Sequence, residues 1–527
     1  MLALVEEPRA NARRLARSTA IFSAATGLSR VLGLVREIVA RGYFGVEGAG
    51  INAFTVAFQV PNLVRALVAD AALSSAFVPV FSELLEKGER KRAWRVASTL
   101  FWLMLLALTA LTAAFIVAAP LVMRLFGYDD DLAIGLSRVL FPIVALLGVS
   151  GIVVGILNSY DHFSIPALTP VAWNLVIIAG LVIGVPLADS ESAELYVYAG
   201  SILLGTFVQV LLPLPWLRGR DDRLRVLIDW RDPAVRQVFK LMGPVMLGLG
   251  LINVNAVIGT LFAARLIDKN LAPAAIDAAF RVYMLPQGMF SVAVATVLFP
   301  SLARLATRGD TDGFRDVISR GLRQINFLLV PASVLSAVLA LPIVRLLYER
   351  GEFGSGETRV VAGALAAFSL GLAFNGMMLM LNRGFFSLQD PWVPTMVALA
   401  NLALNTALYV VLYRAGIWGI PLAISIANIA AVALLLVLMR RRIGRLDLTA
   451  TLRSFLLATV ASALLGAVAF GVWWGLDDLL GRSFLGQLVS LGTAIVVGGA
   501  VYLLAAQALG IREMQALHSL RGRFRKA

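Results

Sequence analysis

Cysteine is absent from this sequence of 527 residues, and histidine occurs twice. The lack of cysteine excludes disulfide bonds, thiolate catalysis and cysteine-based metal sites. His162 and His518 lie far apart in the sequence and are expected in loops, so they do not indicate a metal site. No metal ligand can therefore be named from the sequence.

Charged residues are also scarce. They make up 15% of the chain, whereas a soluble domain usually carries about 25%. Hydrophobic residues make up 59%, and the mean hydropathy is +0.84. Apolar runs of about 20 residues, the length that crosses ~30 Å of hydrocarbon as a helix, recur from end to end. The sequence predicts an all-α membrane protein that crosses the bilayer many times.

We assign about fourteen membrane spans to these runs, after a polar and basic cytoplasmic segment at 1–17. The first run lacks the end of a cleavable signal peptide, so it is expected to remain as a helix. The predicted spans are 18–42, 50–68, 95–123, 132–158, 165–188, 195–217, 236–266, 275–306, 318–347, 357–386, 393–413, 418–440, 454–475 and 485–509.

The formal net charge of +14 would suggest nucleic acid as the partner of a soluble protein. Here the basic residues gather in alternate loops, which the positive-inside rule places in the cytoplasm. Nucleic acid is therefore not expected as a partner, and both termini are predicted to be cytoplasmic. The basic loops are 87–92, 218–236, 308–323 and 440–445, and the acidic loops between them are 129–131, 189–194 and 477–478.

A weak internal repeat divides the chain. Val60-Pro61 leads to 77–79 (FVP), much as Leu285-Pro286 leads to 298–300 (LFP). Repeats of six spans each would be parallel and related by an axis along the membrane normal, with a central cavity between the lobes. The predicted parts are an N-lobe at 18–217, a cytoplasmic linker at 218–235, a C-lobe at 236–440, a cytoplasmic loop at 441–453, a final helix pair at 454–509 and a basic tail at 510–527 that touches anionic headgroups.

The first, second and eighth predicted spans carry Arg30, Arg36, Arg65 and Arg281. An arginine at the bilayer centre costs ~2.5–3.5 kcal/mol, so each must face a cavity or a partner. One interpretation is that they line a common cavity. The alternative is that they snorkel to the membrane surface or pair with Glu37 and Asp70.

Arginine suits phosphate, because its planar fork donates two parallel hydrogen bonds and keeps its charge. The set therefore favours an anionic, phosphate-bearing substrate. Arg30 and Arg36 are six residues apart, about 120° around a helix, so one site can use both only if it is wide or the helix bends at Gly27 and Gly33. A membrane enzyme acting on a lipid diphosphate is the alternative class, but no Walker loop, nucleophile with a base, or carboxylate pair supports it.

Several motifs resemble the MurJ/MviN family of lipid II flippases. The similarity covers nearly the whole chain, in order. The stretches are 29–37 (SRVLGLVRE), 52–54 (NAF), 61–65 (PNLVR), 76–79 (AFVP), 157–158 (LN), 163–166 (FSIP), 242–244 (MGP) and 298–302 (LFPSL).

This resemblance implies a fold of the multidrug/oligosaccharidyl-lipid/polysaccharide exporter superfamily, with fourteen helices in two lobes. The implied activity is movement of lipid II to the outer leaflet of the bacterial cytoplasmic membrane by alternating access, for peptidoglycan synthesis. The final helix pair would hold the lipid tail. The implied substrate-binding residues are Arg30, Arg36, Arg65 and Arg281, supported at the cavity and gate by Glu37, Asn52, Asn62 and Asp70.

Some positions depart from the family pattern. Glu37 replaces an Asp and Asn52 replaces a carboxylate, while Asn253 and Asn255 stand where some relatives bind sodium. We expect no cofactor, and the membrane potential or a monovalent cation gradient would drive transport. Membrane lipids and cell-wall synthases are the other expected partners of a monomeric protein. Export of another undecaprenyl-diphosphate-linked glycan is the alternative function.

Overall fold

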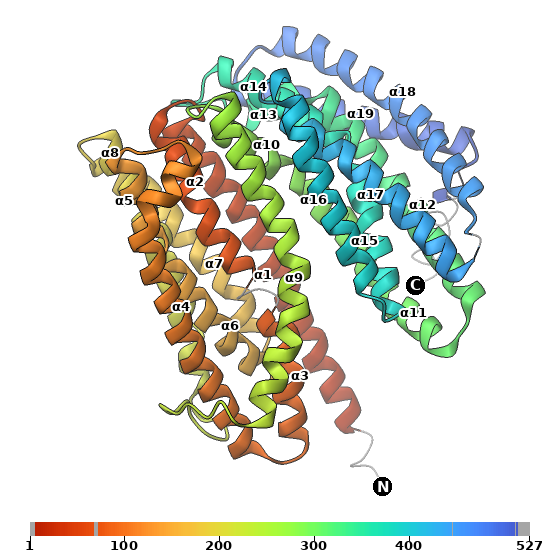
Figure 1. The fold of residues 1–527 in the computed structure, drawn as a ribbon. Coiled ribbons are helices and arrows are strands. Elements are labelled where there is room, and N and C mark those ends of the chain that lie inside the picture. The colour runs from red at the N-terminus through yellow and green to blue at the C-terminus, as the bar shows by residue number, and fades with distance from the viewer. Residues whose placement is uncertain (1–5, 68–71, 445, 512, 515–527) are drawn as a thin grey trace. The chain divides into compact units, whose positions relative to one another are not determined.

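The computed structural model describes residues 6–67, 72–444, 446–511 and 513–514, and every regular element within them is a helix (Figure 1). The predicted all-α fold is thus confirmed. The basic tail beyond residue 514 lies outside the described residues. Part of the predicted polar segment at 1–17 is helical, since the first helix begins at Glu6.

The chain forms two compact units, Met1–Arg265 and Leu266–Ala527. The α-helices of the first unit are α1 (Glu6–Phe44), α2 (Ala49–Arg65), α3 (Ala72–Glu86), α4 (Arg90–Phe126), α5 (Asp131–Leu140), α6 (Ile143–Ser159), α7 (Ser164–Ala179), α8 (Glu191–Leu211) and α9 (Pro233–Phe262). A π-turn, η2 (Gly180–Gly184), and short 3₁₀ turns, η3 (Val185–Leu187) and η4 (Leu214–Leu217), extend α7 and α8, and a π-turn η5 (Ala263–Ile267) follows α9.

The α-helices of the second unit are α10 (Ala272–Pro286), α11 (Val292–Arg308), α12 (Thr311–Val338), α13 (Ala340–Tyr348), α14 (Ser355–Ser369), α15 (Leu372–Ser387), α16 (Trp392–Leu412), α17 (Gly419–Ile443), α18 (Leu448–Leu480) and α19 (Phe484–Ala508). A π-turn, η6 (Gln287–Ser291), joins α10 to α11, and a 3₁₀ turn, η7 (Tyr413–Ala415), follows α16.

Within the described residues, ten helices are long and apolar enough to cross a membrane, and the bent pair α14–α15 would be an eleventh. This chain is therefore a multi-pass membrane protein. α2 falls short of this length because it has 17 residues, and α1 is not among the ten helices. The predicted number of fourteen spans stays a prediction.

The two units share a pattern of helix neighbours, as an internal repeat requires. In the first unit α6 packs on α3, α4 and α8, and α7 packs on α8. In the second, α15 packs on α11, α12 and α17, and α16 packs on α17. The motif prolines sit at matching places, Pro79 inside α3 and Pro300 inside α11.

Helix α9 packs on α3, α2 and α4 and so belongs to the first unit. Its buried residues Val235, Val238 and Met242 join a core cluster with Phe77 and Trp94. This helix falls within the predicted C-lobe, which begins at residue 236. The first compact unit instead ends at Arg265, after α9. The predicted division into lobes stays a prediction.

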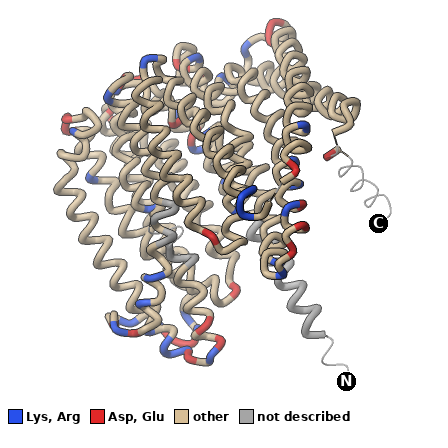
Figure 2. The backbone as a smooth tube through the Cα atoms, turned by 45° about the vertical axis from the view of Figure 1, so that its right-hand side comes forward, with Lys and Arg blue, Asp and Glu red and all other residues tan. Residues whose placement is uncertain are grey.

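The basic loops of the first unit meet at one end of its helices, where Figure 2 shows a cluster of charged residues. Arg90 pairs with Asp221 at 2.7 Å, and Arg92 donates to both oxygens of Asp232 at 3.1 Å. Asp221 also accepts a 2.7 Å hydrogen bond from Tyr160. Burial, and then this bond, raise the pKa of Tyr160 to about 12, so the phenol remains a donor at neutral pH.

The linker at 218–232 is fastened to α4. The backbone N–H groups of Arg225 and Asp229 donate to Ser98 Oγ and Thr99 Oγ1, each at 3.1 Å. Trp102 Nε1 donates to the Arg225 carbonyl at 2.8 Å. The linker is therefore an ordered part of the first unit.

In the second unit, the two basic loops also share one end. Arg315, at the start of α12, donates from Nε to the carbonyl of Ile443, the last residue of α17. This contact also satisfies a free carbonyl at a helix C-terminus, where a cation is favoured.

Candidate functional site

Arg36 lies where α1 packs on α7. Its guanidinium carbon stands 4.7 Å from the centre of the Trp173 ring, a cation–π distance. One and two turns earlier along α1, Gly33 and Ser29 lie against Asn174 of α7, whose Nδ2 donates to the Ser29 carbonyl at 3.3 Å. Small residues let the two helices approach, so the guanidinium is held at the helix interface with 11% of its side chain exposed.

Glu37 is buried, and Arg41 holds it more closely than Arg36 does. Arg41 donates from Nε to Glu37 Oε1 at 3.0 Å, and its Nη2 is 2.9 Å from the same oxygen. Arg36 Nη2 is 3.8 Å from Glu37 Oε2. Arg41 is therefore the nearer of the two cations to this carboxylate.

Arg36 also keeps an unused donor. Its Nε is buried and has no hydrogen-bond partner among the described residues. A buried donor without a partner costs ~1–3 kcal/mol, and more when it is charged. A ligand oxygen that reaches this nitrogen would remove that cost.

Arg30 is exposed on α1, and the structure does not place it on the face that carries Arg36. α1 passes through Gly27 and Gly33 as one continuous helix. The separation of about 120° that helix geometry predicts for the two arginines therefore persists.

The polar residues of α2 have local roles. Asn52 is fully buried, and its Nδ2 donates to the carbonyls of Val46 and Gly48 at 2.8 and 2.9 Å, which fixes the turn between α1 and α2. Asn62 Oδ1 accepts from Arg65 Nε and Nη2 at 3.1 and 2.9 Å, so it orients the Arg65 guanidinium. The predicted supporting residue Asp70 lies outside the described residues.

Arg281 belongs to the second unit, on α10. Its Nη2 is 3.3 Å from Asp277 Oδ1, one turn earlier, and 39% of its side chain is exposed. The pair is half-open to its surroundings, so a second anion can approach the guanidinium.

A chain of amides and a phenol follows Arg281. Gln287 Nε2 donates to Asn375 Oδ1 at 3.0 Å, and Asn375 Nδ2 donates to Tyr283 Oη at 2.9 Å. Gln287 opens the π-turn η6, and such turns often mark functional sites inside helices. These hydrogen bonds tie α10 and η6 to α15.

Sequence reasoning missed several of these residues. Arg41 and Asp277 were visible as partners four residues from Glu37 and Arg281, a spacing that pairs side chains on a helix. Trp173 and Asn375 carry no such signal, because their partners lie far away in the sequence.

The chain is similar to known proteins along most of its length. A family model described as lipid II flippase MurJ matches residues 41–492. A probable lipid II flippase MurJ of Rhizobium tropici is 31% identical over 495 residues, 92% of each chain. A lipid II flippase MurJ of Burkholderia cenocepacia is 29% identical over 443 residues, covering 81% of this chain and 84% of that protein.

Solved structures share the fold. A lipid II flippase MurJ in an inward closed conformation superposes with a TM-score of 0.77 at 24% identity, covering 93% of this chain and 98% of that one. An inward-facing multidrug resistance transporter of the MATE family scores 0.69 at 16% identity, covering 82% and 99%. With the motifs along α1 and α2 and the family model over most of its length, this chain belongs to the lipid II flippase MurJ family.

Proposed function

We propose that this protein moves lipid II from the inner to the outer leaflet of a bacterial cytoplasmic membrane, as a transporter and not as a catalyst. The observation that carries the proposal is Arg36, whose buried Nε has no hydrogen-bond partner among the described residues and whose Nη2 stands 3.8 Å from Glu37. A diphosphate supplies the oxygens that such a group lacks, in the bidentate geometry that arginine favours.

Arg65 is a further cationic group in the first unit, and Arg281 is one in the second. Asn62 orients the Arg65 guanidinium, and Asp277 orients that of Arg281. Each guanidinium is therefore already held in one position before a ligand binds. Alternating access between the two halves of the molecule would carry the polar head across while the prenyl chain stays in lipid. The driving force would be the membrane potential or a gradient of a monovalent cation.

The same proposal includes the orientation. The basic loops gather at one end of each unit, and the positive-inside rule assigns these ends to the cytoplasm. Both termini are then cytoplasmic. The protein would act as a monomer, with cell-wall synthases as candidate partners that receive the flipped lipid.

The test is rescue of bacteria depleted of their own lipid II flippase. Growth and outer-leaflet lipid II are measured for the parent chain, Arg36→Gln and Arg36→Lys. We expect Arg36→Gln to slow flipping about tenfold or more, since a hydrogen bond between charged groups contributes ~1.5–3 kcal/mol. Arg36→Lys should recover part of the rate, because it restores the charge without the planar fork.

Arg320→Gln is the matched control, because Arg320 forms an exposed surface pair with Asp316. It should behave like the parent. Full flipping by Arg36→Gln would contradict the proposed role of this residue. Failure of the parent at normal abundance in the membrane would contradict lipid II as the substrate and favour another undecaprenyl-diphosphate-linked glycan.

A further inference from the structure

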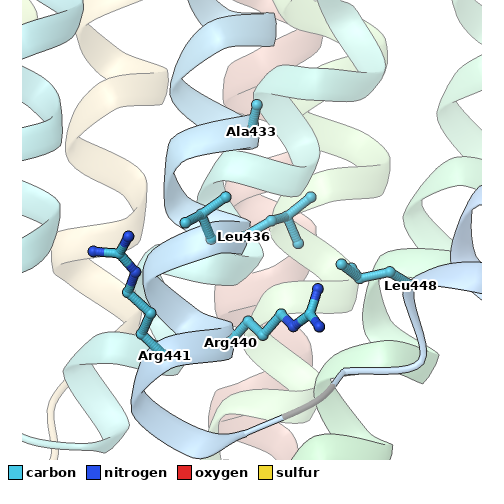
Figure 3. Close-up of a pocket in the computed structure, with 6 residues that line it drawn as sticks. Ala433, Leu436, Arg440, Arg441 and Leu448 are labelled. Atoms are coloured by element: carbon cyan, nitrogen blue, oxygen red, sulfur yellow. The ribbon is translucent and has the colours of Figure 1, made fainter.

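An open groove runs along the last three turns of α17, at the end of the second unit that carries the basic loops. Its volume is about 520 Å³, within the ~300–1,000 Å³ of ligand sites. Figure 3 shows Arg440 extending toward Leu448, the first residue of α18. The lining residues are Ala433, Leu436, Val437, Arg440, Arg441 and Leu448.

The lining is ordered along the helix axis. Residues 433, 436, 437, 440 and 441 share one face of α17, by the spacing of three and four residues. The first three are apolar, and the two arginines follow at the end of the helix. From 433 to 441 the helix rises about 12 Å, close to the ~15 Å depth of one leaflet's hydrocarbon.

The two guanidiniums have no anionic partner among the described residues. The carboxylates of the neighbouring loops are engaged elsewhere. Asp312 pairs with Arg315 at 2.7 Å, Asp316 pairs with Arg320 at 2.8 Å, and Asp447 accepts from the Ala450 N–H at 3.0 Å as the N-cap of α18. The groove therefore holds uncompensated positive charge.

We propose that this groove binds an anionic glycerophospholipid of the membrane. α17 is one of the most apolar spans of the molecule, and Ala433 and Val437 are exposed on it, so lipid is the medium that meets this face. The acyl chain would lie along the apolar wall, and the phosphate would bind at the end of α17 that carries Arg440 and Arg441. This inference is independent of the transported substrate, because all six lining residues lie outside the predicted substrate site.

The first measurement compares the binding of two lipids with equal chains by native mass spectrometry of the full-length protein in detergent. Phosphatidylglycerol carries a net negative charge, and phosphatidylcholine carries none. We expect phosphatidylglycerol to bind more tightly. In Arg440→Gln/Arg441→Gln its affinity should fall about 30-fold, since each cation near an anionic headgroup contributes ~1 kcal/mol and each 1.4 kcal/mol is tenfold.

The matched control is Arg442→Gln/Arg320→Gln. It also removes two positive charges, but from exposed positions that do not line the groove. It should leave the preference for phosphatidylglycerol unchanged. Equal weakening in both double variants would mean a diffuse charge effect and would overturn the site. So would equal affinity of the parent for the two lipids.

A third variant tests the apolar wall. Ala433→Trp fills the groove without changing charge and should weaken binding of phosphatidylglycerol. Thermal melting confirms that each variant is folded. Undecaprenyl phosphate is added as a competitor at a concentration equal to that of phosphatidylglycerol. If it displaces phosphatidylglycerol from the parent, and if its own binding is weakened equally in the arginine double variant, the groove binds an isoprenoid lipid and the proposal is wrong. Displacement by inorganic phosphate alone would indicate a simple anion site.

Discussion

At the scale of single residues, two buried arginines differ in how their charge is balanced. Arg345 on α13 donates from Nη2 to Asp477 and from Nε to Gln487 at 3.3 Å, with the ring of Trp473 at 5.8 Å. Arg36 retains an unbonded Nε beside a carboxylate that another arginine holds. The contacts of Arg345 hold helices together, whereas Arg36 retains a hydrogen-bond donor that a ligand can use.

Replacing Arg345 with alanine should therefore destabilise the fold without touching the proposed substrate site. Asp477 would be left without its partner between α13 and α18, and breaking such a pair costs about 3 kcal/mol. Equilibrium unfolding in mixed micelles measures the loss. In Arg345→Ala/Asp477→Asn the loss should be smaller than the sum of the single losses; full additivity would argue against the pair.

Acid should weaken the contact between α4 and the linker. The hydrogen bonds from Arg92 lower the pKa of Asp232 below its usual 3.8. The stabilisation from this pair is complete above the pKa that Asp232 has in the unfolded chain. It is lost as the pH falls through the lower pKa that Asp232 has in the folded protein. Melting temperatures from about pH 6 to about pH 3 should fall less steeply for Asp232→Asn, which keeps an N-cap side chain. An unchanged slope would refute this origin.

At the scale of elements, the break between α14 and α15 lies against a third helix, α17. The two helices meet at 43°, and Ser425 of α17 donates to the carbonyl of Ala367 at 2.7 Å, near the bend. Gly371 lies against this serine, and a Cβ there would stand 2.8 Å from Ser425 Cα. The bend depends on this close approach of backbone to backbone.

Gly371→Ala should accordingly push α17 away and lower the free energy of unfolding by about 1–3 kcal/mol, the usual cost of overpacking. Gly363→Ala provides the comparison, because the added Cβ on α14 meets nothing within 4 Å. That change should be neutral or stabilising by up to ~1 kcal/mol. Equal effects at both glycines would rule out the close approach as the cause.

The sequence predicts most helices, because apolar periodicity and length are local properties. It also predicts the angle between Arg30 and Arg36, which follows from helix geometry alone. It does not predict the break at Gly371 or the ring of Trp173 over Arg36. These depend on side chains from helices far along the chain, which no local pattern encodes.

At the scale of the whole molecule, the distribution of charge is the feature that the sequence predicts best. Loops called basic from composition alone do meet at one end of the first unit, where Arg90 and Arg92 pair with linker carboxylates. Two acidic segments begin α5 and α8, where Asp130 and Ser190 act as N-caps. The third, at 477–478, is predicted as a loop but lies in the last turn of α18.

The natural lack of cysteine makes the proposed orientation directly testable. Lys91 and Asp189 are exposed and lie in a basic and an acidic segment. In intact cells, a membrane-impermeant maleimide should label Asp189→Cys and spare Lys91→Cys until the membrane is opened. The parent chain supplies the unlabelled background. The reverse pattern would invert the proposed topology.

The length of α4 has a practical consequence for imaging. Its 37 residues span about 55 Å, well beyond ~30 Å of hydrocarbon, and the fastened linker lies along its first turns. We expect this end of the first unit to extend beyond the hydrocarbon, with the linker held against α4. An antibody fragment that binds this end of the first unit would lie outside the detergent micelle. It would help to align particle images in electron cryomicroscopy.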